Sequence, residues 1–205
     1  ILRIIERYSF SKAKKINIVS KGFKQYFSLS YPCTPLSYFT NGIDPEFIEA
    51  AKTNYPILSN KKNISILYAG NIGEGQGLHK IIPHIAKELK DLIHFKVIGA
   101  GGMQKHLINK TQEYSLDNVE IVEPISRKEL IIEYEKSDIL FLHLNNYEAF
   151  LKVLPSKLFE YAAMKKPILA GISGYSAEFA ISEITDCHVF NPSNYKEAVK
   201  KRLLS

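Results

Sequence analysis

The sequence predicts an α/β fold, a doubly wound parallel sheet that follows the remnant of a preceding domain. Two observations support this prediction. From residue 64 onward, apolar runs alternate six times with helical patterns, and the runs are apolar throughout instead of alternating with polar residues. Continuous apolar strands are typical of parallel sheets that helices cover on both faces. Ligands of such folds bind at the carboxyl ends of the strands, near helix N-termini.

The first part of the chain is less regular. A helix, a short strand, a second helix and a second strand are expected over residues 1–15, 16–20, 22–27 and 35–39. The first helix mixes apolar side chains with Arg and Lys, which indicates an amphipathic element. Asn41-Gly42 marks a turn. Residues 45–63 are polar, and we expect an irregular linker there.

The regular part of the chain begins after this linker. Strands are expected at 64–69, 94–98, 119–123, 138–144, 167–171 and 187–190. Helices are expected at 78–90, 102–114, 127–136, 156–164, 176–184 and 194–204. The alternation places each helix after a strand, which predicts helices on both sides of a parallel sheet.

A glycine-rich loop, Gly70-Asn-Ile-Gly-Glu-Gly-Gln-Gly77, joins the first of these strands to its helix. Glycine lets a backbone approach a ligand closely, and a helix N-terminus presents free N–H groups with partial positive charge. The loop is therefore either an anion site, most often for phosphate, or an ordinary tight turn. It matches neither common phosphate fingerprint: no register fits G-x-G-x-x-G, and Gln76 stands where the P-loop requires lysine.

A second motif, Pro155-Ser-Lys-Leu-Phe-Glu160, follows the fourth of these strands. Ser156 is the expected N-cap of a helix, and Glu160, four residues on, shares its face. A carboxylate there can accept hydrogen bonds from vicinal sugar hydroxyls, and Lys152 and Lys157 can neutralise phosphate oxygens. The plainer alternatives are a favourable charge near a helix N-terminus for Glu160 and a solvated surface lysine for Lys157.

These motifs together resemble the retaining glycosyltransferases of family 4, whose GT-B architecture has two Rossmann-like domains. The segments that carry the resemblance are Tyr68-Ala-Gly-Asn-Ile-Gly73, Val97-Ile-Gly-Ala-Gly101, Asp138-Ile-Leu-Phe-Leu142 and Pro155-Ser-Lys-Leu-Phe-Glu-Tyr-Ala-Ala-Met-Lys-Lys-Pro167. The last of them resembles enzymes that build bacterial surface polysaccharides, including transferases of the fucosamine type.

The resemblance implies a division of the chain and a reaction. Residues 64–205 would form the C-terminal, donor-binding domain, and residues 1–44 the end of an N-terminal acceptor domain that is otherwise missing, with 45–63 as the linker. The enzyme would transfer a sugar from a nucleotide diphosphate sugar, with uridine diphosphate (UDP) as the favoured nucleotide. The acceptor would be a polysaccharide or a lipid-linked sugar, the anomeric configuration would be retained, and neither a metal nor another cofactor is implied.

The substrate-binding residues that the resemblance implies come from three segments. They are Gly70, Asn71, Ile72 and Gly73 in the glycine loop, Pro124 and Ile125 after the third of the regular strands, and Lys152, Lys157, Leu158 and Glu160 around the second motif. The loop would face the diphosphate, Pro124-Ile125 would pass the base, and Glu160 would hold the ribose. No catalytic residue is assigned.

Two departures from the family pattern concern charge. Many members carry Arg and Lys in the glycine loop, at places that hold Asn71 and Gln76 here. Lys152 stands where the family has the first glutamate of a pair, the one that usually contacts the sugar. Positive charge for a diphosphate would therefore come from Lys152, Lys157 and backbone amides.

Composition narrows the remaining classes. Lys and Arg number 27 against 21 acidic residues, a surplus too mild for a nucleic-acid partner but compatible with peripheral contact at an anionic membrane. Cys33 and Cys187 form no ligand cluster, so we expect a reducing compartment, buried thiols, and a cytoplasmic location that extends to the inner face of the cell membrane. The histidines lack metal spacing, and His143, near a strand end, either faces the site or is structural.

Two other functions remain open at this point. A sugar-nucleotide epimerase of the same architecture would use similar donor contacts. A non-catalytic α/β interaction module would use the glycine loop only as a turn.

Overall fold

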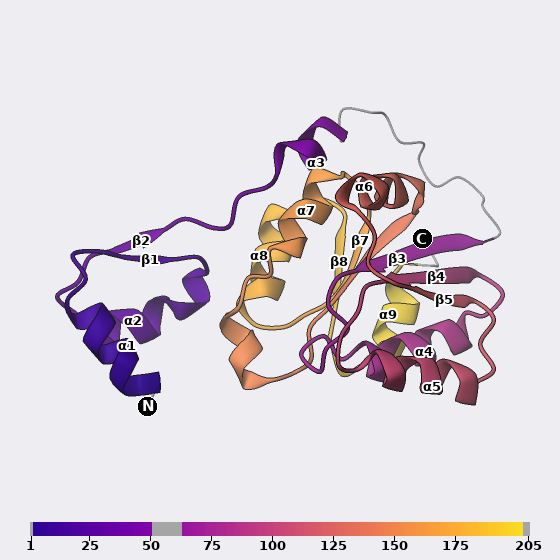
Figure 1. Ribbon diagram of the computed structural model, residues 1–205, viewed down its shortest axis with the longest axis horizontal. Helices are drawn as coiled ribbons and strands as arrows, with labels where there is room; N and C mark the ends of the chain where they lie inside the picture. Colours follow the sequence, from indigo (N-terminus) through magenta and orange to yellow (C-terminus); the bar gives the residue numbers. More distant parts are fainter. Residues whose placement is uncertain (1, 51–62, 203–205) are drawn as a thin grey trace.

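A computed structural model describes residues 2–50 and 63–202 of the chain (Figure 1). Within these residues the main element is a six-stranded parallel sheet in the order β5-β4-β3-β6-β7-β8. The strands are β3 (Ile64–Ala69), β4 (Ile93–Ile98), β5 (Val119–Val122), β6 (Ile139–His143), β7 (Ile168–Gly171) and β8 (Cys187–Phe190). The order runs from β3 to one edge and then from β6 to the other, so β3 and β6 flank a topological switch point.

Helices cover both faces of this sheet (Figure 1). They are α4 (Leu78–Glu88), α5 (Gln104–Glu113), α6 (Arg127–Lys136), α7 (Lys157–Ala163), α8 (Tyr175–Glu183) and α9 (Tyr195–Arg202). Side chains of α4, α5 and α9 share one apolar layer with Ile66 and Tyr68, and those of α6, α7 and α8 share the other with Leu67 and Ala69. Successive strand residues thus point to opposite faces, both of which are buried.

The predicted fold class is confirmed, and the expected strands and helices of this domain are found within about two residues of their predicted ends. The agreement has a physical basis. Strands buried on both faces are apolar at every position, and the helices that cover them carry apolar stripes, so both leave strong local signals.

A small unit precedes the sheet and lies to one side of it (Figure 1). Its elements are α1 (Leu2–Ser11), β1 (Ile16–Ile18), the short 3₁₀ helix η1 (Lys21–Phe23), α2 (Lys24–Ser30) and β2 (Leu36–Tyr38). The strands β1 and β2 pair in parallel, and Ile16, Ile18 and Tyr31 form a core with the rings of Phe10 and Phe27. The expected order of helices and strands is therefore correct here as well.

The expectation of irregular structure from residue 45 is wrong for its first six residues, which form the helix α3 (Pro45–Ala50). Phe47 of this helix is 2% exposed and packs against Tyr134 of α6, with 5.9 Å between ring centroids. A single buried ring in one short polar helix leaves little periodicity to detect. The remainder of the expected linker, residues 51–62, lies outside the described part of the chain.

The expectation for the thiols is also wrong, because Cys33 is exposed and Cys187 is only partly buried. Cys33 lies outside the core clusters of the described residues, and Cys187 only packs against the edge of one of them. Among the helices that the structure describes, none has both the length and the apolar character needed to cross a bilayer.

Replacement of Phe47 by alanine tests whether α3 belongs to the core of the sheet domain. We expect Phe47→Ala to lower the free energy of unfolding by about 3 kcal/mol, because the ring leaves a cavity beside Tyr134. Ile48→Ala is the matched control, since Ile48 is 49% exposed and its loss should change stability by less than about 0.5 kcal/mol. Urea unfolding followed by far-UV circular dichroism measures both, and equal effects would contradict the packing of α3.

Candidate functional site

A cleft of about 310 Å³ lies at the carboxyl edge of the sheet, beside the ends of β3, β4 and β5. Its lining residues are Ala69, Gly70, Asn71, Ile98, Gly99, Ala100, Pro124, Ile125, Leu130 and Lys157. Half of the predicted site residues are among them: Gly70, Asn71, Pro124, Ile125 and Lys157. The fold thus brings one residue of the second motif, the first residues of the glycine loop and the turn after β5 to one cavity.

The floor of this cleft is backbone, because two loops touch there. A Cβ atom at Gly99 would lie 1.8 Å from the carbonyl oxygen of Gly70, so only glycine fits. The Gly70 N–H donates to the carbonyl of Ile98 at 2.9 Å, and the Ile72 N–H donates to the carbonyl of Ala100 at 2.8 Å. The first half of the glycine loop is therefore fixed to the end of β4.

The first turn of α7 supplies the charged wall of the cleft. Lys157 Nζ lies 2.9 Å from Glu160 Oε2 and donates to the hydroxyl of Tyr134 at 3.4 Å. The side chains of Lys157 and Glu160 are 26% and 23% exposed, so the pair is half-buried but reachable from solvent. Burial raises the pKa of Tyr134 above its ordinary value, with Tyr161 and Glu160 adding to the shift, so this hydroxyl remains protonated.

Ser156 does not cap α7 through its side chain, contrary to expectation. Its backbone is already helical, with φ −59° and ψ −31°, whereas a capping side chain needs an extended backbone to reach the next turn. The Ser156 carbonyl instead accepts from the N–H of Phe159 at 3.0 Å. The helix start is thus where the sequence predicts it, but the hydroxyl plays no capping part.

The other half of the predicted set does not line the cleft. Ile72 and Leu158 are fully buried in the two apolar layers. The Gly73 N–H donates to Gln76 Oε1 at 3.2 Å, and Glu160 reaches the cleft through its ion pair with Lys157. Lys152 ends η2 (Glu148–Lys152) and faces the N-terminal unit, where its carbonyl accepts from Ser20 Oγ at 2.5 Å.

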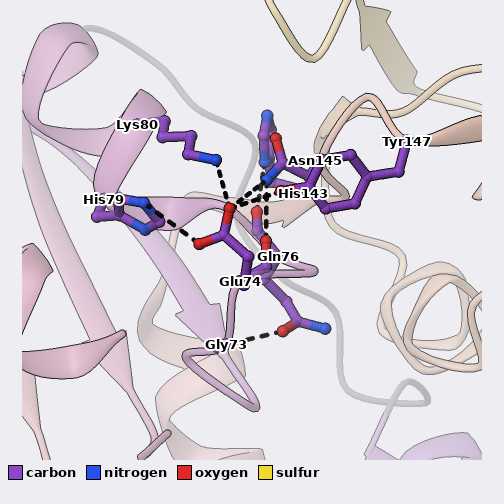
Figure 2. Close-up of polar contacts among 8 residues, drawn as sticks. All are labelled: Gly73, Glu74, Gln76, His79, Lys80, His143, Asn145 and Tyr147. Atoms are coloured by element: carbon purple, nitrogen blue, oxygen red, sulfur yellow. Dashed lines mark hydrogen bonds and ion pairs between the residues drawn. The ribbon is translucent and has the colours of Figure 1, made fainter. Parts of the chain in front are cut away.

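A clamp that the sequence did not reveal holds the second half of the glycine loop (Figure 2). Its centre is the carboxylate of Glu74, which accepts from Lys80 Nζ, from the hydroxyl of Tyr147 at 2.6 Å and from Asn145 Nδ2 at 3.4 Å. These donors, Lys80 first and Tyr147 next, lower the pKa of Glu74 to about 2. Asn145 also donates its backbone N–H to the carbonyl of Gly75 at 2.8 Å.

Two further contacts join this clamp to the cleft. Asn71 Nδ2 donates to Gln76 Oε1 at 2.9 Å, so the two neutral amides of the loop hold each other. Behind them His143 is buried, with Nδ1 2.6 Å from the carbonyl oxygen of Gln76 (Figure 2). His143 therefore lies behind the loop and not in the lining of the cleft. The sequence held one signal for it, a histidine that ends an apolar strand.

Comparison with known proteins decides the family. Residues 52–204 match the family model described as glycosyl transferases group 1. The chain belongs to this family. A protein of Escherichia coli K12, provisionally named a colanic acid biosynthesis glycosyl transferase (WcaI), is 31% identical over 111 residues, which cover 54% of this chain and 26% of that protein.

Solved structures of glycosyltransferases share the fold. Anabaena Alr3699/HepE in complex with UDP and glucose matches with a TM-score of 0.72 and 14% identity, over 97% of this chain and 55% of that one. A trehalose-6-phosphate synthase matches with a TM-score of 0.71 and 11% identity, over 96% of this chain and 55% of that one. The group 1 chain therefore spans about half the length of these structures and about a quarter of WcaI.

Loss of the Glu74 carboxylate tests the clamp. Because its pKa is about 2, Glu74 is ionised at every pH above that, and the support it gives is complete above the ordinary value of 4.5 and lost as pH falls toward 2. We expect Glu74→Gln to speed amide hydrogen exchange in residues 73–77 roughly threefold to tenfold at pH 7.

The matched control is Glu113→Gln, which removes a surface ion pair with Lys110 of 2.7 Å on α5. It should leave exchange in the glycine loop unchanged, because the exposed pair lies outside the clamp. Equal protection of residues 73–77 in wild type and Glu74→Gln would show that the carboxylate does not hold the loop.

Proposed function

We propose that this chain carries the donor-binding site of a retaining glycosyltransferase that uses a nucleotide diphosphate sugar, with UDP as the nucleotide. The observation that carries the proposal is the cleft at the carboxyl edge, where the glycine loop, the Pro124-Ile125 turn and Lys157 meet. Family membership supports the transferase, and the HepE structures, in complex with UDP and with UDP-glucose, support the nucleotide. Retention is supported by the similarity to the trehalose-6-phosphate synthase, whose structure is described as one of enzymatic glycosyltransfer with retention.

The lining of the cleft suggests how the donor is held. Pro124, Ile125 and Leu130 give an apolar surface against which a base can pack. Gly70 and Asn71 form the backbone floor, which lets a diphosphate approach closely. Lys157 is the one lysine among the lining residues that the structure describes. Its ammonium group would therefore stabilise the negative charge that develops on the leaving diphosphate.

Glu160 completes this binding mode. Its carboxylate already accepts from Lys157, and a carboxylate has acceptor capacity for further donors. When the lysine turns to the diphosphate, Glu160 can accept from the vicinal hydroxyls of the ribose. The ion pair in the free protein therefore keeps both side chains beside the cleft until the nucleotide replaces each partner.

The acceptor side of the proposal rests on the first residues. Residues 1–44 are proposed to be the end of an acceptor-binding domain, and residues 64–205 the donor domain. A polysaccharide or lipid-linked acceptor, met at the inner face of the cell membrane, fits the colanic acid role in the name of WcaI. Transfer needs donor and acceptor held together, so we propose that this chain binds the donor but does not turn it over alone.

Calorimetry with UDP tests the site. Lys157→Ala and Glu160→Ala should each weaken binding roughly tenfold or more, since each removes a charge-assisted hydrogen bond to the nucleotide. Lys90→Ala is the matched control: it removes a lysine paired with Asp117 at 3.3 Å, at the opposite edge of the sheet, and should leave affinity unchanged.

Each alternative function has its own outcome. If both cleft variants bind UDP as the wild type does, or if nothing binds, the chain is better described as a non-catalytic interaction module. If the intact protein converts the donor sugar into its epimer without transfer, the epimerase is favoured. A glycosylated acceptor with an inverted anomeric centre would contradict retention.

A further inference from the structure

The buried His143 occupies a place built for an imidazole ring. It ends β6 and is 1% exposed, and its ring packs beside those of Phe141 and Phe190, with centroids 6.1 Å and 6.0 Å away. On the neighbouring strand, a Cβ atom at Gly171 would lie 2.2 Å from His143 Cδ2. The glycine is therefore what leaves room for the ring.

Both ring nitrogens of His143 face carbonyl oxygens. Nδ1 lies 2.6 Å from the oxygen of Gln76, and Nε2 lies 3.0 Å from that of Pro192. A carbonyl oxygen only accepts, and a neutral imidazole has one N–H and one lone pair. The neutral ring can therefore satisfy one carbonyl, whereas the imidazolium, with two N–H groups, satisfies both.

One of these two carbonyls belongs to Gln76, which is connected to the cleft by hydrogen bonds. Gln76 accepts from His143 through its backbone, while its side chain accepts from the Gly73 N–H and from Asn71 Nδ2. Asn71 in turn lines the cleft. The position of Gln76 thus sets both the orientation of Asn71 and the availability of the Gly73 N–H. The other carbonyl, of Pro192, anchors the ring to the segment between β8 and α9.

We propose that His143 positions the glycine loop for the donor phosphates through a hydrogen bond to the Gln76 carbonyl, and that nucleotide binding is coupled to protonation of this ring. The proposal rests on the nucleotide site proposed above. The imidazolium holds both carbonyls at once, and a bound diphosphate adds negative charge that favours the protonated ring. Binding should therefore tighten as pH falls.

Protonation of His143 should have the opposite effect on the stability of the fold, which falls as the pH falls. Burial lowers the pKa of His143 below its ordinary 6.5, although the carbonyls of Gln76 and Pro192 oppose the shift. The unfolded chain then binds the proton first, so this ring contributes stability above pH 6.5 that is lost as pH falls through the folded pKa. If His143 only filled space, its protonation would weaken the fold around the loop, and nucleotide affinity would then fall together with stability as the pH falls.

Within the described part of the chain, titratable groups face the ring from two sides. On the side of the loop and α4 they are Glu74, His79 and Lys80; Glu197 of α9 bonds the Asn191 N–H on the other side. Lys80 does not titrate in the pH range of the test, because its hydrogen bond with Glu74 raises its pKa above the ordinary 10.5. His79 is the neighbour to control, since burial lowers its pKa as well.

The binding test uses UDP-glucose, which has no terminal phosphate that titrates near pH 6 as that of UDP does. In calorimetry on the wild-type chain, affinity should rise as the pH falls below 6.5, toward a limit of roughly tenfold that a pKa difference of up to one unit between the free and bound forms sets. His79→Gln should keep this pH dependence. A flat wild-type profile would overturn the coupling.

Two variants separate the two carbonyls. The amide of His143→Asn replaces Nδ1 and can still donate to Gln76, whereas that of His143→Gln replaces Nε2 and can still donate to Pro192. Neither titrates, so both should lose the pH dependence. His143→Asn should bind within about threefold of the wild type at pH 5.5, and His143→Gln roughly tenfold more weakly. Equal losses, at equal melting temperatures, would leave His143 only a packing role and overturn the proposal.

Nuclear magnetic resonance on the ligand-free chain keeps the inference separate from the proposed function. The ring ¹⁵N signals of His143 report its protonation, and the amide signals of Gly73 and Gly77 report the loop. In the wild type, we expect the chemical shifts of the ring and of these amides to titrate with one midpoint. In His143→Asn, the amide chemical shifts should not change with pH. Independent midpoints would overturn the inference even if UDP-glucose binds, and a shared midpoint would support it even if the nucleotide does not.

Discussion

The arrangement of the site depends on how the gap at the switch point is filled. The chain leaves β3 toward α4 on one face of the sheet and leaves β6 toward α7 on the other, so the two exits part. Backbone N–H and C=O groups in such a gap need partners. Here the exit of β6 supplies them: His143 bonds the carbonyl of Gln76, and Asn145 bonds that of Gly75. One strand end thus serves as the support for the loop of the other.

Charge follows from this support. The glycine loop is held by neutral amides and by a carboxylate, Glu74, whose donors already compensate it. The loop therefore adds no cation of its own to the cleft, and the positive charge that a diphosphate needs is concentrated on Lys157. Because Lys157 is paired with Glu160, the nucleotide proposed to bind here would rearrange both side chains together. A loop without charge is specific only if its backbone is fixed, which is what the clamp does.

Local patterns in the sequence were sufficient for the strands and helices of the sheet domain and for the glycine loop, because each depends on neighbours along the chain. The clamp was not predictable, because Glu74 meets Tyr147 across 73 residues and Gln76 meets His143 across 67. The burial of Phe47 depends on Tyr134 in the same way. Lys152 was grouped with Lys157 by its closeness in sequence, yet the 3₁₀ turn η2 directs it to the N-terminal unit. Sequence therefore identified the elements of the site but not the contacts between them.

The segment from Asn145 to Lys157 joins all these parts. It begins with the donors that clamp the glycine loop, continues through η2, and ends at the lysine of the cleft. At η2 it also meets the N-terminal unit, where a Cβ atom at Gly22 would lie 2.6 Å from the carbonyl oxygen of Lys152. Such a close contact leaves no room for η2 to move toward η1. The proposed acceptor side therefore meets, at η2, the same short stretch of backbone that carries the donors of the clamp and Lys157.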